Sequence, residues 1–97
     1  LVAQALVTRG GADAVIALGA VIRGETGHYD FVAGECAAGL SRVQLDTGIP
    51  VVFGVLTTEN LEQALERARP EEMDKGGEAL QAALEMVLAL REISRSE

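Results

Sequence analysis

Several residue types are scarce in this sequence of 97 residues, and each scarcity excludes a class of protein. A single cysteine, Cys36, permits no internal disulfide, so a reducing, cytoplasmic location is the default expectation. One histidine and one cysteine cannot form a zinc site, and we expect no metal. Basic residues number 8 against 15 acidic ones, which argues against a nucleic-acid-binding surface.

Long hydrophobic runs and secretory signals are also lacking. No apolar stretch approaches the roughly 20 residues of a membrane span, and no signal peptide is recognisable at the start. Neither a Walker loop, nor a Gly-x-Ser-x-Gly elbow, nor a Rossmann fingerprint occurs. The sequence does not begin with Met, and its first residues already show helical spacing, so we expect further residues upstream.

What is present is the patterning of one small α/β domain. Apolar periodicity and breaker residues predict six elements: a helix over 1–9 stopped by Gly10 and Gly11, a strand over 13–22, a helix over 28–47, a strand over 50–57, a helix capped by Thr58 and closed by Pro70, and a helix from Asp74 toward Arg95. This order predicts two parallel strands joined by a right-handed crossover.

Both strands are apolar without alternation, which is typical of strands buried on both faces. Two such strands cannot close a domain alone. Either more strands precede residue 1, or neighbouring subunits provide the missing cover. The last helix supports the same expectation through two adjacent apolar stripes, Leu80–Leu84–Val87 and Ala83–Met86–Leu90–Ile93, which are wide enough to pack against two neighbours.

The segment GAVIRGETGHYDF, residues 19–31, contains the first candidate site. Ligands of open α/β sheets bind beyond the carboxyl ends of strands, and the glycine-flanked turn Arg23–Gly27 follows such an end. Backbone N–H groups and the Thr26 hydroxyl can hold a phosphate there, provided that the Glu25 carboxylate points away. His28 comes next, and an imidazole transfers protons near neutral pH. The alternative is a glycine turn capped by Thr26, with a histidine that has no role.

Four further residues have structural interpretations from the sequence alone. Arg67 lies near a helix C-terminus, where a cation is favourable in any case. Lys75, beside two glycines, reads as solvated. Cys36 lies on the apolar helical stripe of Val32, Leu40 and Val43, and Phe53 lies in a strand, so both are expected in the core.

Taken together, DAVIALGAVIRGETGHYDFVAGE, GIPVVFGVLTTENLEQALERA and DKGGEALQAALEM strongly resemble the lumazine synthase family of riboflavin biosynthesis. The resemblance runs from the first residue to the last helix. It implies a flavodoxin-like, three-layer α/β/α fold with a parallel sheet. Residues 1–97 would form a single domain matching the C-terminal two-thirds of the family domain, without its N-terminal strands.

The resemblance also implies a function. Family members are transferases that condense 5-amino-6-ribitylaminouracil with 3,4-dihydroxy-2-butanone 4-phosphate to give 6,7-dimethyl-8-ribityllumazine, without a cofactor. They assemble as homopentamers or as icosahedral shells of sixty subunits, and riboflavin synthase is a candidate partner. Neither nucleic acid nor a membrane is involved.

Residue roles carry over by position. The turn at Gly24, Glu25 and Thr26 would bind the phosphate, His28 would shuttle protons, and the backbone around Val21 and Ile22 would contact the pyrimidine. Arg67, Lys75 and Phe53 would approach the same site from the adjacent subunit.

Two local departures from the family pattern affect this site. Gly27 stands where the family usually has a non-glycine residue, which predicts a looser turn before His28. The loop ARPEEMDKG replaces a small, basic one and brings Glu71 and Glu72 near the expected phosphate, where they weaken anion binding unless they face solvent or pair with Arg69. Two alternatives therefore stand beside the enzyme: an assembly or shell protein without activity, and a module that binds lumazine or flavin without turnover.

Overall fold

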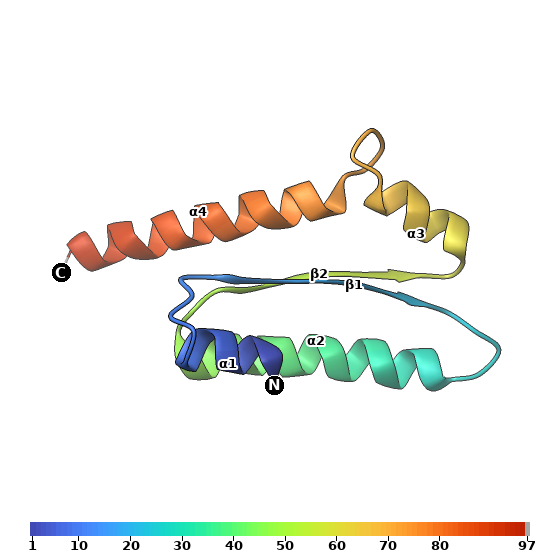
Figure 1. Cartoon of the computed structure of the whole chain (residues 1–97), viewed down its shortest axis with the longest axis horizontal. Helices are drawn as coiled ribbons and strands as arrows, with labels where there is room; N and C mark the ends of the chain where they lie inside the picture. Colours follow the sequence, from blue (N-terminus) through green and yellow to red (C-terminus); the bar gives the residue numbers. More distant parts are fainter. Residues whose placement is uncertain (97) are drawn as a thin grey trace.

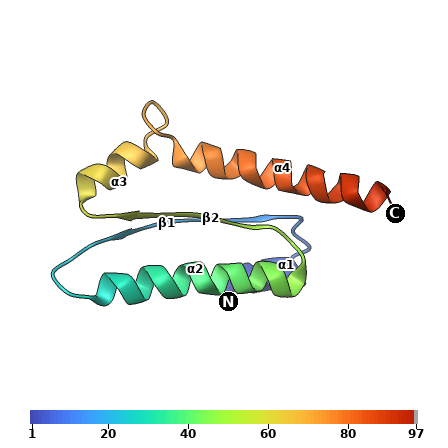
Figure 2. The ribbon, with the colours of Figure 1, turned by 180° about the vertical axis from the view of Figure 1, so that it is seen from behind.

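The computed structural model describes residues 1–96 and places helices on both faces of one parallel sheet (Figure 1). The elements in chain order are α1 (Val2–Thr8), β1 (Val15–Ile22), α2 (His28–Thr47), β2 (Val51–Thr58), α3 (Leu61–Ala68) and α4 (Lys75–Arg95). Helices α1 and α2 cover one face, and α3 and α4 cover the other (Figures 1 and 2). The predicted α/β class, element order and three-layer arrangement are confirmed.

The two strands pair in parallel along their whole length. Val15 lies opposite Val51 at one end, and Ile22 lies opposite Thr58 at the other. One more bond extends the ladder, because the Arg23 N–H donates to the Thr58 carbonyl oxygen at 2.9 Å. The strands therefore end at the same level, and the turns that follow them adjoin.

Three helix boundaries are set by residues that can be recognised in the sequence: a glycine, a proline and a capping aspartate. Gly48 ends α2 in a left-handed conformation, with φ of 73°. Arg69 is extended after α3, because the residue before a proline avoids the helical region. The Asp74 carboxylate caps α4 by accepting from the Gly77 N–H.

The predicted cap of α3 is wrong. Thr58 is the last, buried residue of β2, and its hydroxyl donates to the Asn60 carbonyl oxygen at 3.0 Å. The cap is Asn60, whose side-chain oxygen accepts from the Gln63 N–H at 2.8 Å. Gln63 in turn accepts from the Glu59 N–H at 2.9 Å, so two N–H groups at the helix start are satisfied.

The core is smaller than the sequence predicts. The buried apolar residues are Val15, Val51, Ala64, Ala79 and Ala83. The prediction that both strands are buried on both faces is wrong for the middle of β1, where Leu18 is 68% exposed. Each strand has one hydrogen-bonded edge within residues 1–96, and the other edge is open.

Close packing occurs where α4 crosses β2. A Cβ added to Gly54 would lie 2.9 Å from Leu18 Cδ2, 3.0 Å from the Ala17 carbonyl oxygen and 3.4 Å from the Ala79 Cβ. The helix thus approaches the sheet through small side chains. The contact residue Ala79 lies outside both predicted stripes of α4, whereas Leu80 and Leu84 of the first stripe remain about half exposed.

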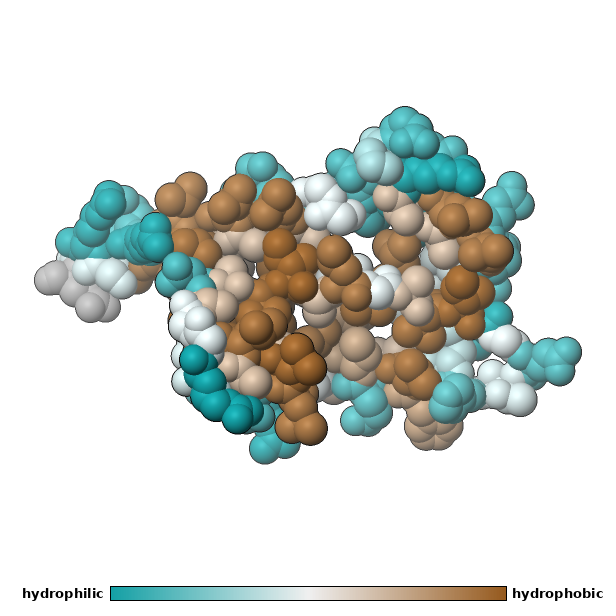
Figure 3. All heavy atoms as spheres, in the orientation of Figure 1, coloured by the Kyte–Doolittle hydropathy of each residue, from teal (hydrophilic) through white to brown (hydrophobic). Residues whose placement is uncertain are grey.

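Much apolar surface is left uncovered. The accessible surface is 6773 Å², against about 5,300 Å² for a compact monomer of this mass. The radius of gyration is 15.0 Å, against about 12.5 Å for a typical domain of this length. Figure 3 shows hydrophobic side chains across the middle of one face, and a hollow of about 370 Å³ between β1 and α4 is lined by Ile16, Leu80 and Leu84 among others. Such a surface is typical of a chain that packs against other polypeptide. None of the helices within residues 1–96 is both long and apolar enough to span a bilayer.

Candidate functional site

Most of the expected site residues of the first segment line one hollow at the carboxyl end of β1. This histidine hollow has a volume of about 330 Å³ and is lined by Ala20, Val21, Ile22, Gly24, Thr26, His28, Tyr29 and Val32. Three consecutive strand residues take part. Since one edge of β1 is bonded to β2, we infer that the hollow opens at the end and free edge of β1.

The start of α2 places His28 beside Thr26. The His28 backbone N–H donates to the Thr26 hydroxyl oxygen at 3.3 Å, and the Asp30 N–H donates to the Gly27 carbonyl oxygen at 3.1 Å. The His28 side chain is exposed and lines the hollow. The N–H groups of His28 and Asp30 therefore already have acceptors within the turn, and the hollow contains an accessible imidazole. The alternative of a glycine turn capped by Thr26 fits the hydrogen bond from the His28 N–H, although Gly27 occupies the N-cap position of the helix and has no side-chain bond.

Glu25 is the one expected residue of this turn that lies elsewhere. Its side chain is exposed and does not line the histidine hollow. A carboxylate outside the hollow repels an anion within it less than one that lines it.

Gly27 has no conformational need to be glycine. Its φ of −71° and ψ of 2° are open to other residues, and an added Cβ would meet no atom within 4 Å. We expect Gly27→Ala to stabilise the protein by about 0.4–1 kcal/mol, because alanine restricts the unfolded chain and strains nothing in the folded one. Urea unfolding of the two proteins measures this. A loss of stability would show that the turn needs a backbone freedom that this geometry does not display.

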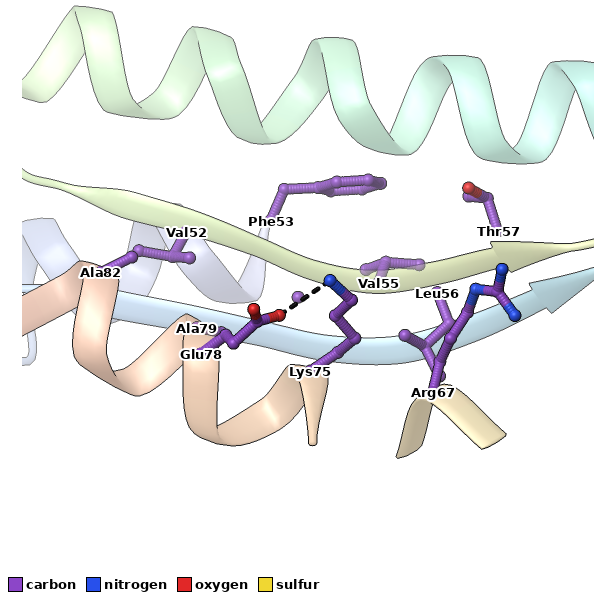
Figure 4. A pocket seen from close by; sticks show the side chains of 11 residues that line it. Val52, Phe53, Val55, Leu56, Thr57, Arg67, Lys75, Glu78, Ala79 and Ala82 are labelled. Atoms are coloured by element: carbon purple, nitrogen blue, oxygen red, sulfur yellow. Dashed lines mark ion pairs between the residues drawn. The ribbon is translucent and has the colours of Figure 1, made fainter. Parts of the chain in front are cut away.

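A second hollow lies along the free edge of β2 and contains the other expected residues (Figure 4). This arginine hollow has a volume of about 380 Å³ and is lined by residues 52–57 of β2 together with Arg67, Lys75, Glu78, Ala79 and Ala82. Phe53 and Thr57 lie on the α2 side of the strand, whereas Arg67 and Lys75 lie on the α3 and α4 side (Figure 4). The prediction from the sequence alone that Phe53 is a core residue is wrong, because its side chain is 41% exposed at an open strand edge.

The two cations of the arginine hollow differ in their partners. Lys75 Nζ lies 2.8 Å from Glu78 Oε2 and is thus paired with a carboxylate of its own helix. Arg67 Nη1 donates to the Gln63 carbonyl oxygen at 3.2 Å, and within residues 1–96 no carboxylate forms an ion pair with it. The half-buried Arg67 guanidinium therefore retains most of its donors for an external anion.

The acidic loop after α3 is partly neutralised. Arg69 Nη1 lies 3.7 Å from Glu72 Oε2, which is the pairing under which this loop interferes least with an anion. Neither Glu71 nor Glu72 lines the arginine hollow. Across residues 1–96, no group of three or more potential ligands could hold a metal ion.

The structure therefore divides the expected residues between two opposite edges of one small sheet. Val21, Ile22, Gly24, Thr26 and His28 line the histidine hollow, and Phe53, Arg67 and Lys75 line the arginine hollow. Neither of these two hollows contains both His28 and Arg67.

Sequence reasoning assigned no role to two residues near these hollows. Tyr29 lines the histidine hollow, and Arg23 contacts Tyr29, Asp30 and Glu59 around the turn. The signal for Arg23 was its position directly after a strand, but its partners on α2 and beyond β2 become neighbours only in the folded chain.

Comparison with known proteins identifies the family of this chain. A family model described as 6,7-dimethyl-8-ribityllumazine synthase matches residues 1–91. A protein of that name from Pectobacterium atrosepticum is 62% identical over 84 residues, which cover 87% of this chain and 53% of that protein. One from Edwardsiella ictaluri is 55% identical over 93 residues, which cover 96% of this chain and 60% of that protein. The chain thus spans little more than half the length of these relatives. It belongs to the 6,7-dimethyl-8-ribityllumazine synthase family.

Proposed function

We propose that this chain forms 6,7-dimethyl-8-ribityllumazine from 5-amino-6-ribitylaminouracil and 3,4-dihydroxy-2-butanone 4-phosphate, at sites shared between neighbouring subunits. The observation that carries the proposal is the gathering of the expected residues into two hollows at opposite sheet edges. The relatives named for this product supply the reaction. Synthesis of a vitamin precursor from small polar molecules suits a cytoplasmic enzyme.

The residues of the two hollows are of the types that the reaction needs. Amine and ketone form an imine with loss of water, inorganic phosphate leaves, and ring closure followed by dehydration releases a second water. The sequence of steps requires proximity and proton transfer rather than a redox group. His28 in the histidine hollow would move protons, while the turn at Gly24 and Thr26 would hold the phosphate.

Arg67 would complete the phosphate site from the neighbouring subunit. Its guanidinium makes a single bond to a backbone carbonyl and has donors to spare. Charge-assisted bonds from a guanidinium both anchor a phosphate and stabilise the negative charge of phosphate as a leaving group. Lys75 would contribute charge to the same region, and Phe53 would present an apolar ring to the uracil substrate.

Assembly is part of the proposal, because each copy presents two unlike half-sites. Contact between unlike surfaces repeats from copy to copy and closes as a ring when the rotation allows. The open strand edges and the exposed leucines support the proposal that neighbouring copies pack against this chain. We propose a pentamer, alone or within a shell of sixty subunits that can accompany riboflavin synthase.

The test is a joint measurement of assembly and turnover. The purified protein is weighed by native mass spectrometry, then incubated with both substrates while product and free phosphate are quantified. We expect a ring-sized oligomer that releases one phosphate per lumazine. An oligomer that binds both substrates but releases neither product nor phosphate would contradict the enzyme function and support an inactive assembly protein.

A further inference from the structure

We infer that Arg23 is the positioning residue that holds the turn carrying Thr26 and His28 against the ends of both strands. This inference rests on the proposed function for its kinetic consequences, but its structural part can be tested separately. Arg23 touches none of the expected reacting groups. It acts through residues on either side of them.

The contacts of Arg23 join three segments that are apart in the sequence. Its backbone N–H is bonded to the Thr58 carbonyl oxygen at the end of β2, and its Nε lies 2.9 Å from Glu59 Oε2. Its Nη2 lies 3.5 Å from Asp30 Oδ1 in the first turn of α2. One guanidinium thereby connects the end of β1, the turn after β2 and the start of α2.

The same guanidinium also packs on Tyr29. The Arg23 Cζ lies 4.2 Å from the centroid of the Tyr29 ring, which is within cation–π distance. Tyr29 is half-buried, lines the histidine hollow and directly follows His28. Fixing Tyr29 and Asp30 fixes the rotation of the first helical turn about its axis, and hence the direction in which His28 leaves the backbone.

The turn itself offers little else to hold it. An added Cβ at Gly24 or at Gly27 would meet no atom within 4 Å, so neither residue is packed against the body of the protein. Arg23 is bonded to Glu59 after β2 and contacts Tyr29 and Asp30 at the start of α2, so its contacts link this loosely packed segment to its surroundings. A planar guanidinium can face two carboxylates and a ring at the same time, which an ammonium cannot.

Charge gives Arg23 a second, separable effect. It is the only lysine or arginine between residues 10 and 41, whereas the carboxylates of Asp30 and Glu59 lie beside the turn. A phosphate at this turn would meet uncompensated carboxylates if the guanidinium were removed. The two effects can be separated with Arg23→Lys. This variant keeps the positive charge but loses the simultaneous contacts of the guanidinium with Asp30, Glu59 and Tyr29.

The experiment compares Arg23→Lys, Arg23→Met and the matched control Arg42→Met in the lumazine assay. Arg42 is also an exposed arginine paired with a carboxylate, at 3.5 Å from Asp46, but it lies near the far end of α2. We expect Arg23→Lys to keep KM for the phosphorylated substrate within twofold and to lower kcat about tenfold, because small misplacements of a reacting group are costly. Arg23→Met should lower kcat similarly and also raise that KM, and Arg42→Met should resemble the parent. Exposed ion pairs contribute little to global stability, so melting temperatures should stay close.

Hydrogen–deuterium exchange of the peptide covering residues 24–31 is the second readout. Faster exchange in both Arg23 variants, and not in Arg42→Met, supports the positioning role. Arg23→Lys with parental kcat and parental exchange would overturn it, even if Arg23→Met fails to fold. If the parent protein makes no lumazine, the proposed function fails, while the exchange data still decide whether Arg23 holds the turn.

Discussion

Replacing Arg67 with alanine is expected to lower kcat/KM about 100- to 1,000-fold, which is the loss typical of removing one donor from a preorganised anion site. The reason is structural. Arg67 is half-buried at the free edge of β2, and within residues 1–96 its guanidinium is bonded to a backbone carbonyl oxygen and to no carboxylate. Alanine would remove the charge-assisted bonds that hold a phosphate and ease its departure. Steady-state measurement of phosphate release with both substrates measures the loss.

The effect must be separated from a loss of folding. A cation near the C-terminus of α3 is worth about 0.3–1 kcal/mol to the helix, so Arg67→Ala should remain folded and assembled. Arg42→Ala is the matched control, because it removes an exposed arginine that pairs within α2 and lines neither hollow. Turnover by Arg67→Ala within twofold of that control would remove Arg67 from the proposed site.

The sequence predicted the fold well where the chemistry is local. Gly48 and Asp74 marked helix ends through backbone conformation and capping, and both were placed correctly. The error at Thr58 arose because two cap-forming residues, Thr58 and Asn60, lie only two positions apart. In the structure Thr58 is still part of β2 and is buried there. The helix therefore begins after Asn60, and Asn60 is its cap.

Burial was predicted less well, because it depends on what lies beyond the pattern. Apolar runs over β1 and β2 indicate strands that are buried when both faces and both edges are covered. Within residues 1–96 each strand has one open edge, so Leu18 and Phe53 are exposed despite their types. The hydrophobic pattern thus indicates strands suited to a sheet that is covered on both faces and both edges, which residues 1–96 alone do not form.

The site was predicted in part from residues and in part from resemblance. The strand–turn–histidine arrangement indicated the histidine hollow without any relative, because parallel strands present their carboxyl ends to ligands. Arg67 had an adequate structural explanation as a helix-terminal cation, and only the resemblance gave it a role in the site. The sequence pattern could not show that the hollows of Arg67 and His28 lie at different edges of the sheet, because this depends on the order of the strands in the folded chain.

Mixing two inactive variants is expected to restore about one quarter of the parental activity. Arg67→Ala chains retain an intact histidine hollow, and His28→Ala chains retain an intact arginine hollow. In rings of unlike contacts assembled at random from equal amounts, each site has about one chance in four of pairing two intact halves. His28→Ala alone should lose about 100-fold in kcat, as is typical when a proton-transfer group is removed.

The measurement requires co-assembly. The two variants are unfolded together, refolded, and assayed beside each variant treated alone, with native mass spectrometry of differently tagged chains confirming mixed rings. Recovery toward one quarter follows only if His28 of one subunit and Arg67 of another serve the same reaction. If the two residues acted within one chain, every site would carry a defect and mixed rings would be as inactive as their parents. The strand order makes that second outcome unexpected, because the body of the sheet separates the two edges.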